Sequence, residues 1–284
     1  MSKVKILVDS TSDIPENIRK RYCIDFVPLF IIFGEDSFRD GIDITVPEIF
    51  EMVDKRNMLP KTSAVNQVEL FQTFQRLTAD GSEVVFIGIS SEISTTVQNA
   101  LLVASEIPDN KVHVFDSKNL SIGIAIQAIK AAELAEQGKS AQEIMNFLNE
   151  ISPKVRTSFI VKDLNYLKMG GRCSSLQAFA GSLLNIKPKI HLENGFVVAG
   201  ENFRGSREKI VQKLIESSAS DLPNIDMDTV LLAHAFASDR DVQIAKDCLL
   251  SLMPDIKNLI VTTTGGVISS HCGPETVGLV YKLK

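Results

Sequence analysis

Five hydroxyl side chains follow the apolar run EVVFIG at residues 83–88, and they belong to Ser90, Ser91, Ser94, Thr95 and Thr96. Such a cluster could contain a nucleophile, cradle a phosphate or hold another anion. A serine nucleophile needs an activating base and an oriented third group. The G-x-S-x-G elbow is absent, because the segment GISSE lacks the second glycine. The cluster therefore favours an anion site, with a plain helix cap at Ser91 or Ser94 as the alternative.

A second pair of hydroxyls, Thr62 and Ser63, lies in the segment PKTSAVN, just before a helix start at Asn66. Unpaired backbone N–H groups at a helix N-terminus favour an anion. In a parallel sheet, ligands bind beyond the carboxyl ends of the strands, where helix N-termini also point. We therefore expect both hydroxyl segments to meet at one rim. No P-loop pattern is present and no G-x-G-x-x-G follows a strand-like run, so nucleotide binding has no motif here.

Two further residues could contact an anion. His271 lies in the segment TTTGGVISSHCGPETVG, which we expect to form a loop between strand-like runs. Arg172 follows two glycines in KMGGRCSS, and its planar guanidinium suits a carboxylate or a phosphate. The alternative is that His271 is a hydrogen-bonded structural residue and that Arg172 is merely solvated. Sequence alone leaves both alternatives open.

Composition restricts the class of protein. The 284 residues include 30 basic and 35 acidic side chains, for a net charge of −5, which gives no electrostatic footprint for nucleic acid or acidic lipid. A hydrophobic content of 44% indicates a folded globular chain. The first residues lack the apolar core of a signal peptide, and no apolar stretch is long enough for a membrane helix. We expect a cytoplasmic protein with no nucleic-acid partner and no integral membrane segment.

Cysteines and histidines are scattered along the chain. None has the paired spacing of a metal site, so we expect neither a metal nor a cofactor. The cysteines are interpreted as reduced thiols packed as small apolar residues. The residues are Cys23, Cys173, Cys248, Cys272, His113, His191, His234 and His271.

Strand-like and helix-like segments alternate in the first half, which predicts a parallel sheet covered by helices. Helix start signals combine a capping residue with a glutamate three residues later. They occur at Asp13/Glu16, Thr45/Glu48, Asn66/Glu69 and Ser140/Glu143. Beyond Pro153 the pattern becomes mixed, and ENG lies between two extended runs as in a hairpin. The fold class is therefore α/β with two domains, a parallel-sheet domain at residues 1–154 and a mixed domain at residues 155–284, sharing a ligand cleft.

An ordered series of segments resembles the landmarks of the DegV family of bacterial fatty-acid-binding proteins over nearly the whole chain. The segments are VDSTSD, FRDGIDI, PKTS, ISSEIS, FDSKNLSIG, FIVKDLNYLKMGGR, the Lys187-Pro188 pair and SSHCGPETVG. The resemblance implies a carrier that encloses one long-chain fatty acid and presents it to a separate fatty acid kinase, which makes acyl-phosphate for phospholipid synthesis. It implies no catalytic residues and no cofactor in the carrier itself.

The resemblance also assigns roles to individual positions. Thr62 and Ser63 match the TS pair of the family, and Ser94 matches the second serine of its SSxLSGT loop. All three would donate hydrogen bonds to the carboxylate. His271 would join that network or face the kinase. Arg172 would lie beside the ligand mouth, and both Arg172 and Arg204 would belong to the partner surface.

Two other functions remain possible from the sequence. One is an acyl hydrolase or transferase that uses Ser94 and His271, which requires the two side chains to lie within hydrogen-bond reach. The other is a lipid-sequestering protein without a kinase partner. The chain also departs from the family pattern, because Glu275 stands where the family has the second glycine of its GPG turn. Phe26, Ile31 and Phe33 are candidates to line a tail cavity, with ordinary core packing as the alternative.

Overall fold

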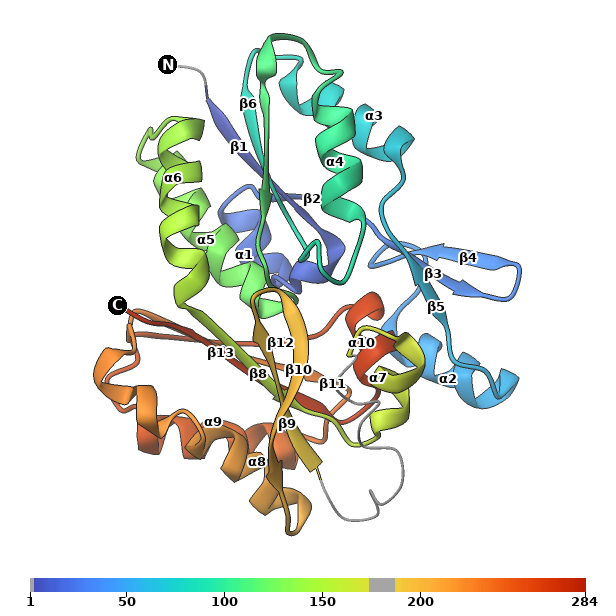
Figure 1. Cartoon of the computed structure of the whole chain (residues 1–284), viewed down its shortest axis with the longest axis vertical. Helices are drawn as coiled ribbons and strands as arrows, with labels where there is room; N and C mark the ends of the chain where they lie inside the picture. Colours follow the sequence, from blue (N-terminus) through green and yellow to red (C-terminus); the bar gives the residue numbers. More distant parts are fainter. Residues whose placement is uncertain (1–2, 174–186) are drawn as a thin grey trace.

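Two large sheets, one from each half of the chain, form the framework of the molecule (Figure 1). The computed structural model describes residues 3–173 and 187–284. The first sheet has the order β2-β1-β6-β7, and all its neighbouring strands are parallel. Its strands are β1 (Val4–Asp9), β2 (Asp25–Val27), β6 (Glu83–Gly88) and β7 (Val112–Asp116). The predicted parallel sheet is therefore confirmed.

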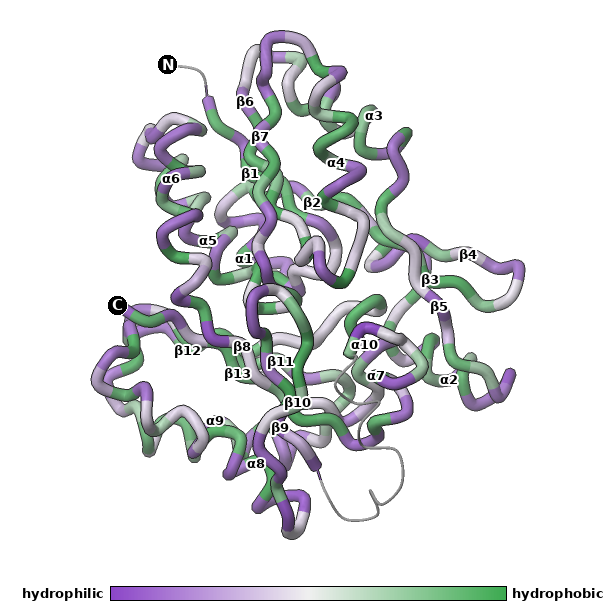
Figure 2. The backbone as a smooth tube through the Cα atoms, viewed as in Figure 1, coloured by the Kyte–Doolittle hydropathy of each residue, from purple (hydrophilic) through white to green (hydrophobic). Residues whose placement is uncertain are grey.

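Helices cover both faces of this sheet, which explains why its strands are continuously apolar. Val84 and Phe86 of β6 pack on one side, whereas Val85 and Ile87 pack on the other. Hydrophobic residues gather along the strands, and hydrophilic ones along the outer turns (Figure 2). The helices of this half are α1 (Glu16–Arg21), α3 (Gln67–Thr78), α4 (Thr96–Ala104), α5 (Ile122–Glu136) and α6 (Ala141–Ile151).

A small antiparallel sheet of order β4-β3-β5 projects from the first half, and the sequence analysis did not predict it. Its strands are short, and β5 carries Thr62, which pairs with Ile31 of β3. Thr62 and Ser63, just before the helix start at Asn66, therefore belong to an edge strand. The elements are β3 (Phe30–Phe33), β4 (Asp36–Arg39), β5 (Lys61–Ser63) and the neighbouring helix α2 (Val46–Arg56).

The second sheet has six strands in the order β10-β9-β8-β13-β11-β12. Only β11 and β12 pair in parallel, so the predicted mixed sheet is confirmed. The predicted hairpin turns at Asn194 and Gly195, which both have positive φ. The strands are β8 (Val155–Ile160), β9 (Lys187–Glu193), β10 (Phe196–Phe203), β11 (Thr229–Ala235), β12 (Asn258–Thr263) and β13 (Thr276–Lys282).

One face of the second sheet packs on two long helices, and its other face turns toward the first half (Figure 1). Two short helices lie beside the junction of the halves. The helices are α7 (Leu164–Gly170), α8 (Arg207–Glu216), α9 (Asp239–Leu252) and α10 (Gly266–Cys272). We propose the domain boundary between residues 154 and 155, because the larger sheet takes all its described strands from Val155 onward.

Helix α5 packs between the two sheets. Its residues pack against the first sheet through Ile124 and Ala128, and against the second sheet through Ile122 and Ile126. A helix that is apolar on all sides is typically buried. None of the helices in the described part of the chain is both long enough and apolar enough to cross a bilayer.

Three of the four predicted helix caps are confirmed. Capping boxes form at Thr45 and Ser140, and the Asn66 side chain accepts a hydrogen bond from the backbone N–H of Glu69. The helix expected near Pro15 is present as α1, but the cap predicted at Asp13 is wrong, because the N-cap position is Pro15 and has no side-chain cap. Asp13 instead points into the interior, where other groups donate hydrogen bonds to it. The Asp13 carboxylate is therefore used in contacts with Ser121 and Gly265 and does not cap α1.

Candidate ligand-binding site

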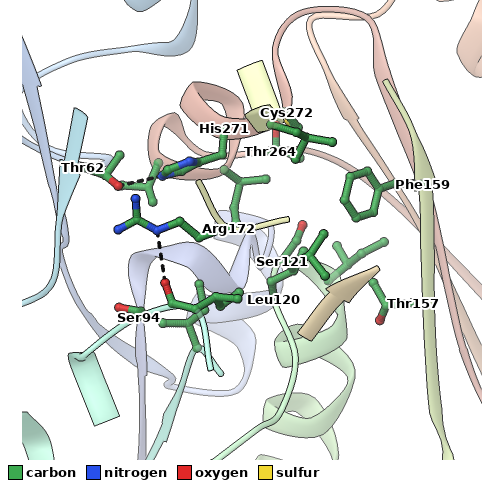
Figure 3. A pocket seen from close by; sticks show the side chains of 18 of the residues that line it. Thr62, Ser94, Leu120, Ser121, Thr157, Phe159, Arg172, Thr264, His271 and Cys272 are labelled. Carbon is green, nitrogen blue, oxygen red and sulfur yellow. Dashed lines mark hydrogen bonds between the residues drawn. The ribbon is translucent and has the colours of Figure 1, made fainter. Parts of the chain in front are cut away.

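A cavity of about 330 Å³ lies between the two halves and takes lining residues from both (Figure 3). Its volume falls within the roughly 300–1,000 Å³ of small-molecule pockets. Thr62, Ser94, Arg172 and His271 gather at one end, called the hydroxyl-rich end below (Figure 3). The remainder is mainly apolar, with single hydroxyls such as that of Ser121. All five residues predicted to bind the ligand line this cavity, namely Thr62, Ser63, Ser94, Arg172 and His271. Arg204 does not line it; this residue is exposed just after β10.

Thr62 and His271 form the best-defined contact at the hydroxyl-rich end. Thr62 Oγ1 lies 2.7 Å from His271 Nε2, although 209 positions separate the two residues in sequence. His271 was expected in a loop but occupies the last turn of α10. The ring lies against Gly170. The protonation state of the imidazole decides whether His271 or Thr62 donates.

The imidazole of His271 is held neutral. Burial, followed by the charge of Arg172, lowers the pKa of His271 to about 4. Its Nδ1 faces Gly170 and has no hydrogen-bond partner among the described residues. A proton on Nε2 would let His271 donate to Thr62 Oγ1 and leave Nδ1 as an unpaired acceptor rather than a buried, unpaired N–H. In that tautomer the hydroxyl hydrogen of Thr62 is free to donate into the cavity.

The serines after β6 have different roles. Ser94 Oγ accepts a hydrogen bond from the backbone N–H of Thr96 at 3.3 Å, so this residue does support the start of α4. Ser91 does not cap the helix, because its hydroxyl donates to Asp116 at 2.5 Å. The Ser90 hydroxyl donates to the carbonyl of Gly195 at 2.8 Å and thus links the β9–β10 hairpin to the segment after β6. Ser94 thus contacts the first residue of α4 and lines the cavity, whereas the N-cap position belongs to Thr95 and has no side-chain cap.

Arg172 lies beside Thr62 and His271 at the cavity (Figure 3). Its Nη1 donates to the carbonyl of Gly170 at 2.7 Å, and its Nε to the carbonyl of Ile93 at 3.4 Å. The side chain is exposed and forms no ion pair with any residue that the structure describes. Arg172 therefore brings a positive charge to the hydroxyl-rich end.

The inner face of the second sheet forms the floor of the cavity. Phe159, Ala233 and Gly278 lie side by side there on β8, β11 and β13. The Thr157 hydroxyl near the floor is already paired within the protein, because it donates to Asn119 Oδ1 at 2.7 Å. The floor therefore presents mainly carbon atoms to a ligand.

Of the two interpretations given for Phe26, Ile31 and Phe33, lining of a tail cavity is wrong, and core packing holds for Ile31 and Phe33. Ile31 and Phe33 are fully buried in the core beneath α3, and Phe26 lies against the guanidinium of Arg19. None of them lines the cavity. One wall of the lining comes from β8, β11 and β13, because the sheet of the second half faces the gap between the halves, and the rest comes from loops and helices of both halves.

The cysteines differ in exposure. Cys173 and Cys272 are buried, which agrees with packing as small apolar residues, but Cys23 is exposed. Cys272 lines the cavity, and burial raises the pKa of its thiol to about 12, so the thiol stays protonated. Within residues 3–173 and 187–284, no three His, Cys, Asp or Glu side chains gather as metal ligands would.

Sequence reasoning missed a group of buried carboxylates beside this site. Asp9, Asp13 and Asp40 are 0%, 7% and 1% exposed, and burial raises the pKa of each one. They belong to the segments VDSTSD and FRDGIDI, which contributed to the family resemblance but received no role. Aspartates among small polar residues gave a signal for turns, and their burial depended on contacts from the other half of the chain.

Comparison with known proteins assigns the family. The sequence model described as "Uncharacterised protein, DegV family" matches residues 3–284. The chain belongs to the DegV family. It is 32% identical to Protein DegV of Bacillus subtilis over 99% of both chains. It is also 32% identical to a protein of Thermotoga maritima named fatty acid-binding protein, over 97% of this chain and 96% of that one.

The fold agrees with a solved DegV family structure from Thermus thermophilus, which is described by its fatty acid binding. The TM-score is 0.90 at 30% identity, over 99% of this chain and 100% of that chain. The two-domain DegV fold expected from the sequence is therefore confirmed. At the position of the second glycine in the family's GPG turn, Glu275 adopts φ of 59°, a left-handed conformation that favours glycine.

Proposed function

We propose that this protein binds one long-chain fatty acid and presents it to a separate fatty acid kinase in the cytoplasm. The tail would occupy the apolar part of the cavity, and the carboxylate would accept hydrogen bonds from Thr62, Ser63 and Ser94. One observation carries the proposal: a mainly apolar cavity between the two halves has hydroxyls and a neutral histidine gathered at one end. Fatty acid binding by the Thermotoga and Thermus relatives supports the choice of ligand.

We expect the tail to contribute most of the binding free energy and the hydroxyl contacts to orient the carboxylate. Burial of the methylenes of a C16 acid, at about 0.8 kcal/mol each, would contribute on the order of 11 kcal/mol before the costs of association. Neutral hydroxyls can orient a carboxylate without a tight ion pair. An oxygen thus stays available for phosphoryl transfer, a reaction that depends mainly on positioning and electrostatics. No cofactor and no catalytic group of the carrier are required.

Mass spectrometry of the purified protein tests the ligand directly. A native spectrum should show one non-covalent fatty acid per chain, and organic extraction should release it and identify its length. A protein that is empty and also refuses added palmitate would contradict the proposal. In that case the family relationship would extend to the fold but not to the ligand.

Removal of the three hydroxyls should weaken fatty acid binding strongly. Hydrogen bonds to a charged group are worth about 1.5–3 kcal/mol each, so the combined variant Thr62→Ala, Ser63→Ala, Ser94→Ala should raise the Kd for palmitate at least 100-fold. Ser105→Ala is the matched control, because its exposed hydroxyl only donates to Leu102 O at the far end of α4. Equal Kd values in all three proteins would exclude the hydroxyl clamp.

Arg172 and Arg204 are proposed for the kinase surface, since both side chains are exposed. Arg204→Ala should lower acyl-phosphate formation by the cognate kinase about tenfold, because interface arginines often dominate binding. The Kd for palmitate should stay the same, since Arg204 lies outside the cavity. Arg76→Ala, on α3, serves as a control for loss of one exposed arginine. Bound palmitate with no acyl-phosphate from the wild-type carrier would instead favour simple lipid sequestration.

The alternative acyl hydrolase has weaker support. Ser94 Oγ interacts with Thr96, whereas His271 Nε2 interacts with Thr62, and no hydrogen bond joins Ser94 to His271 in the described structure. Covalent labelling of Ser94 by a fluorophosphonate probe would revive this alternative. Absence of labelling in a protein that retains lipid would exclude it.

A further inference from the structure

Helix α10 of the second half begins against carboxylates of the first half. Asp13 Oδ1 accepts a hydrogen bond from the backbone N–H of Gly265 at 2.7 Å. Asp40 Oδ1 accepts one from the backbone N–H of Gly266 at 2.8 Å. The helix provides no side-chain cap of its own, because its N-cap residue is Gly265. Its first N–H groups need acceptors, and negative charge is favoured at this end of a helix.

Both carboxylates are held from behind. The Ser10 hydroxyl donates to Asp40 Oδ2 at 2.8 Å and in turn accepts from the backbone N–H of Leu29 at 3.0 Å. The Ser121 hydroxyl donates to Asp13 Oδ2, and Ser121 lines the cavity at the start of α5. Asp13 therefore connects α10 with the start of α5, across the junction of the two halves.

Steric contacts leave α10 little freedom at this point. A Cβ atom at Gly266 would lie 2.5 Å from Ile31 Cδ1 and 2.6 Å from Ile49 Cδ1. Only glycine allows this close approach of the backbone to the first half. The position of α10 is thus set by two hydrogen-bonded carboxylates and by direct packing.

The same helix carries four residues that line the cavity, and His271 is near its C-terminal end. A displacement at the start of so short a helix would move His271 relative to Thr62, which belongs to the other half. We infer that Asp13 and Asp40 are positioning residues that act through α10 to hold His271 Nε2 against Thr62 Oγ1. The inference deepens the proposed function and rests on it for the identity of the ligand.

The third buried carboxylate provides a matched comparison. Asp9 accepts hydrogen bonds from the backbone N–H of Thr11 at 3.0 Å and from that of Ile89 at 2.7 Å. Neither donor belongs to α10. Asp9→Asn therefore changes a carboxylate as deeply buried as Asp40, but it leaves both acceptors of α10 in place.

The experiment follows the Thr62–His271 hydrogen bond directly by NMR of the imidazole groups in protein labelled with ¹⁵N-histidine. In the wild type, the Nε2–H of His271 should exchange slowly with water, and Thr62→Ala assigns its signal. Asp40→Asn should remove or clearly shift this signal and raise the Kd for palmitate at least tenfold. Asp9→Asn should keep the signal. Ser10→Ala removes one hydrogen bond to Asp40 and should give a smaller shift in the same direction.

The outcomes separate the two proposals. An unchanged His271 signal in both Asp40→Asn and Ser10→Ala would overturn the positioning role. A lost signal with an unchanged Kd would overturn the link between this position and ligand binding. If Asp40→Asn fails to fold, Ser10→Ala decides the question alone. If the wild type binds no palmitate, the proposed function fails, whereas the NMR signal still tests whether Asp40 positions His271.

Discussion

Replacement of Gly278 by leucine should eject a long-chain fatty acid from the cavity. Gly278 lies in β13 between Phe159 of β8 and Ala233 of β11, on the floor of the cavity. A Cβ atom at this position would lie 3.4 Å from Phe159 Cβ, which is ordinary contact or nearly so. The first carbon therefore fits, and the rest of the leucine side chain would project into the space proposed for the tail.

The expected loss of affinity follows from the displaced volume. Leucine adds four carbons, which would displace about four methylenes of the tail at about 0.8 kcal/mol each, or roughly 3 kcal/mol. The Kd for palmitate should thus rise by about 100-fold or more, whereas an acid shorter by four carbons should lose much less. Calorimetric titrations with C16 and C12 acids measure this difference.

The control for this prediction lies on the other face of the same strand. Val277→Leu adds bulk to the core beneath α8 and α9 but not to the cavity. It should lower Tm without a change in chain-length preference. An unchanged Kd for palmitate in Gly278→Leu, with native circular dichroism, would show that the tail does not lie on this floor.

The second large effect concerns stability and pH. Burial raises the pKa of Asp9 from 3.8 to about 6, while hydrogen bonds from Thr11 and Ile89 partly oppose the shift. Between these values the native state binds more protons than the unfolded state, so the free energy of unfolding falls as the pH rises. This contribution is fully present below about pH 4 and lost above about pH 6. A shift of this size corresponds to about 3 kcal/mol.

Other ionisable groups also affect how the free energy of unfolding depends on pH. Burial also raises the pKa of Asp13 and Asp40, and the charges of Asp9 and Asp40 add to the shift of Asp13. On the surface, hydrogen bonds lower the pKa of Asp43 and Glu143 to about 2. Asp43 and Glu143 therefore add to the free energy of unfolding at higher pH, and this addition is lost only as the pH falls below about 4. Stability should therefore be greatest near pH 4 to 5.

Urea denaturation at several values between pH 4 and pH 7 tests this sign. The free energy of unfolding should fall by at least 2 kcal/mol across this range, and Asp9→Asn should make the dependence shallower. Glu143→Gln is a suitable control, because this glutamate caps α6 on the surface and titrates at lower pH. A wild-type stability that increases steadily from pH 5 to pH 7 would contradict the prediction.

The sequence by itself determined the features that depend on local pattern. Apolar runs such as EVVFIG predicted strands buried on both faces, and the capping boxes at Thr45 and Ser140 were both confirmed. The Asn194–Gly195 turn was equally readable, because positive φ at two successive residues restricts the residue types. These signals act over a few residues, so spacing alone was sufficient.

Tertiary structure decided the features that depend on contacts between distant segments. Thr62 on β5 and His271 on α10 belong to different halves and meet only in the folded protein. No local rule predicts a contact across 209 positions. Asp13 was predicted to cap a helix, but its buried carboxylate accepts hydrogen bonds from the backbone N–H of Gly265 and the hydroxyl of Ser121. The hydroxyl-rich end was thus visible residue by residue in the sequence. Its assembly depended on how the second sheet, α10 and the buried carboxylates bring the two halves together.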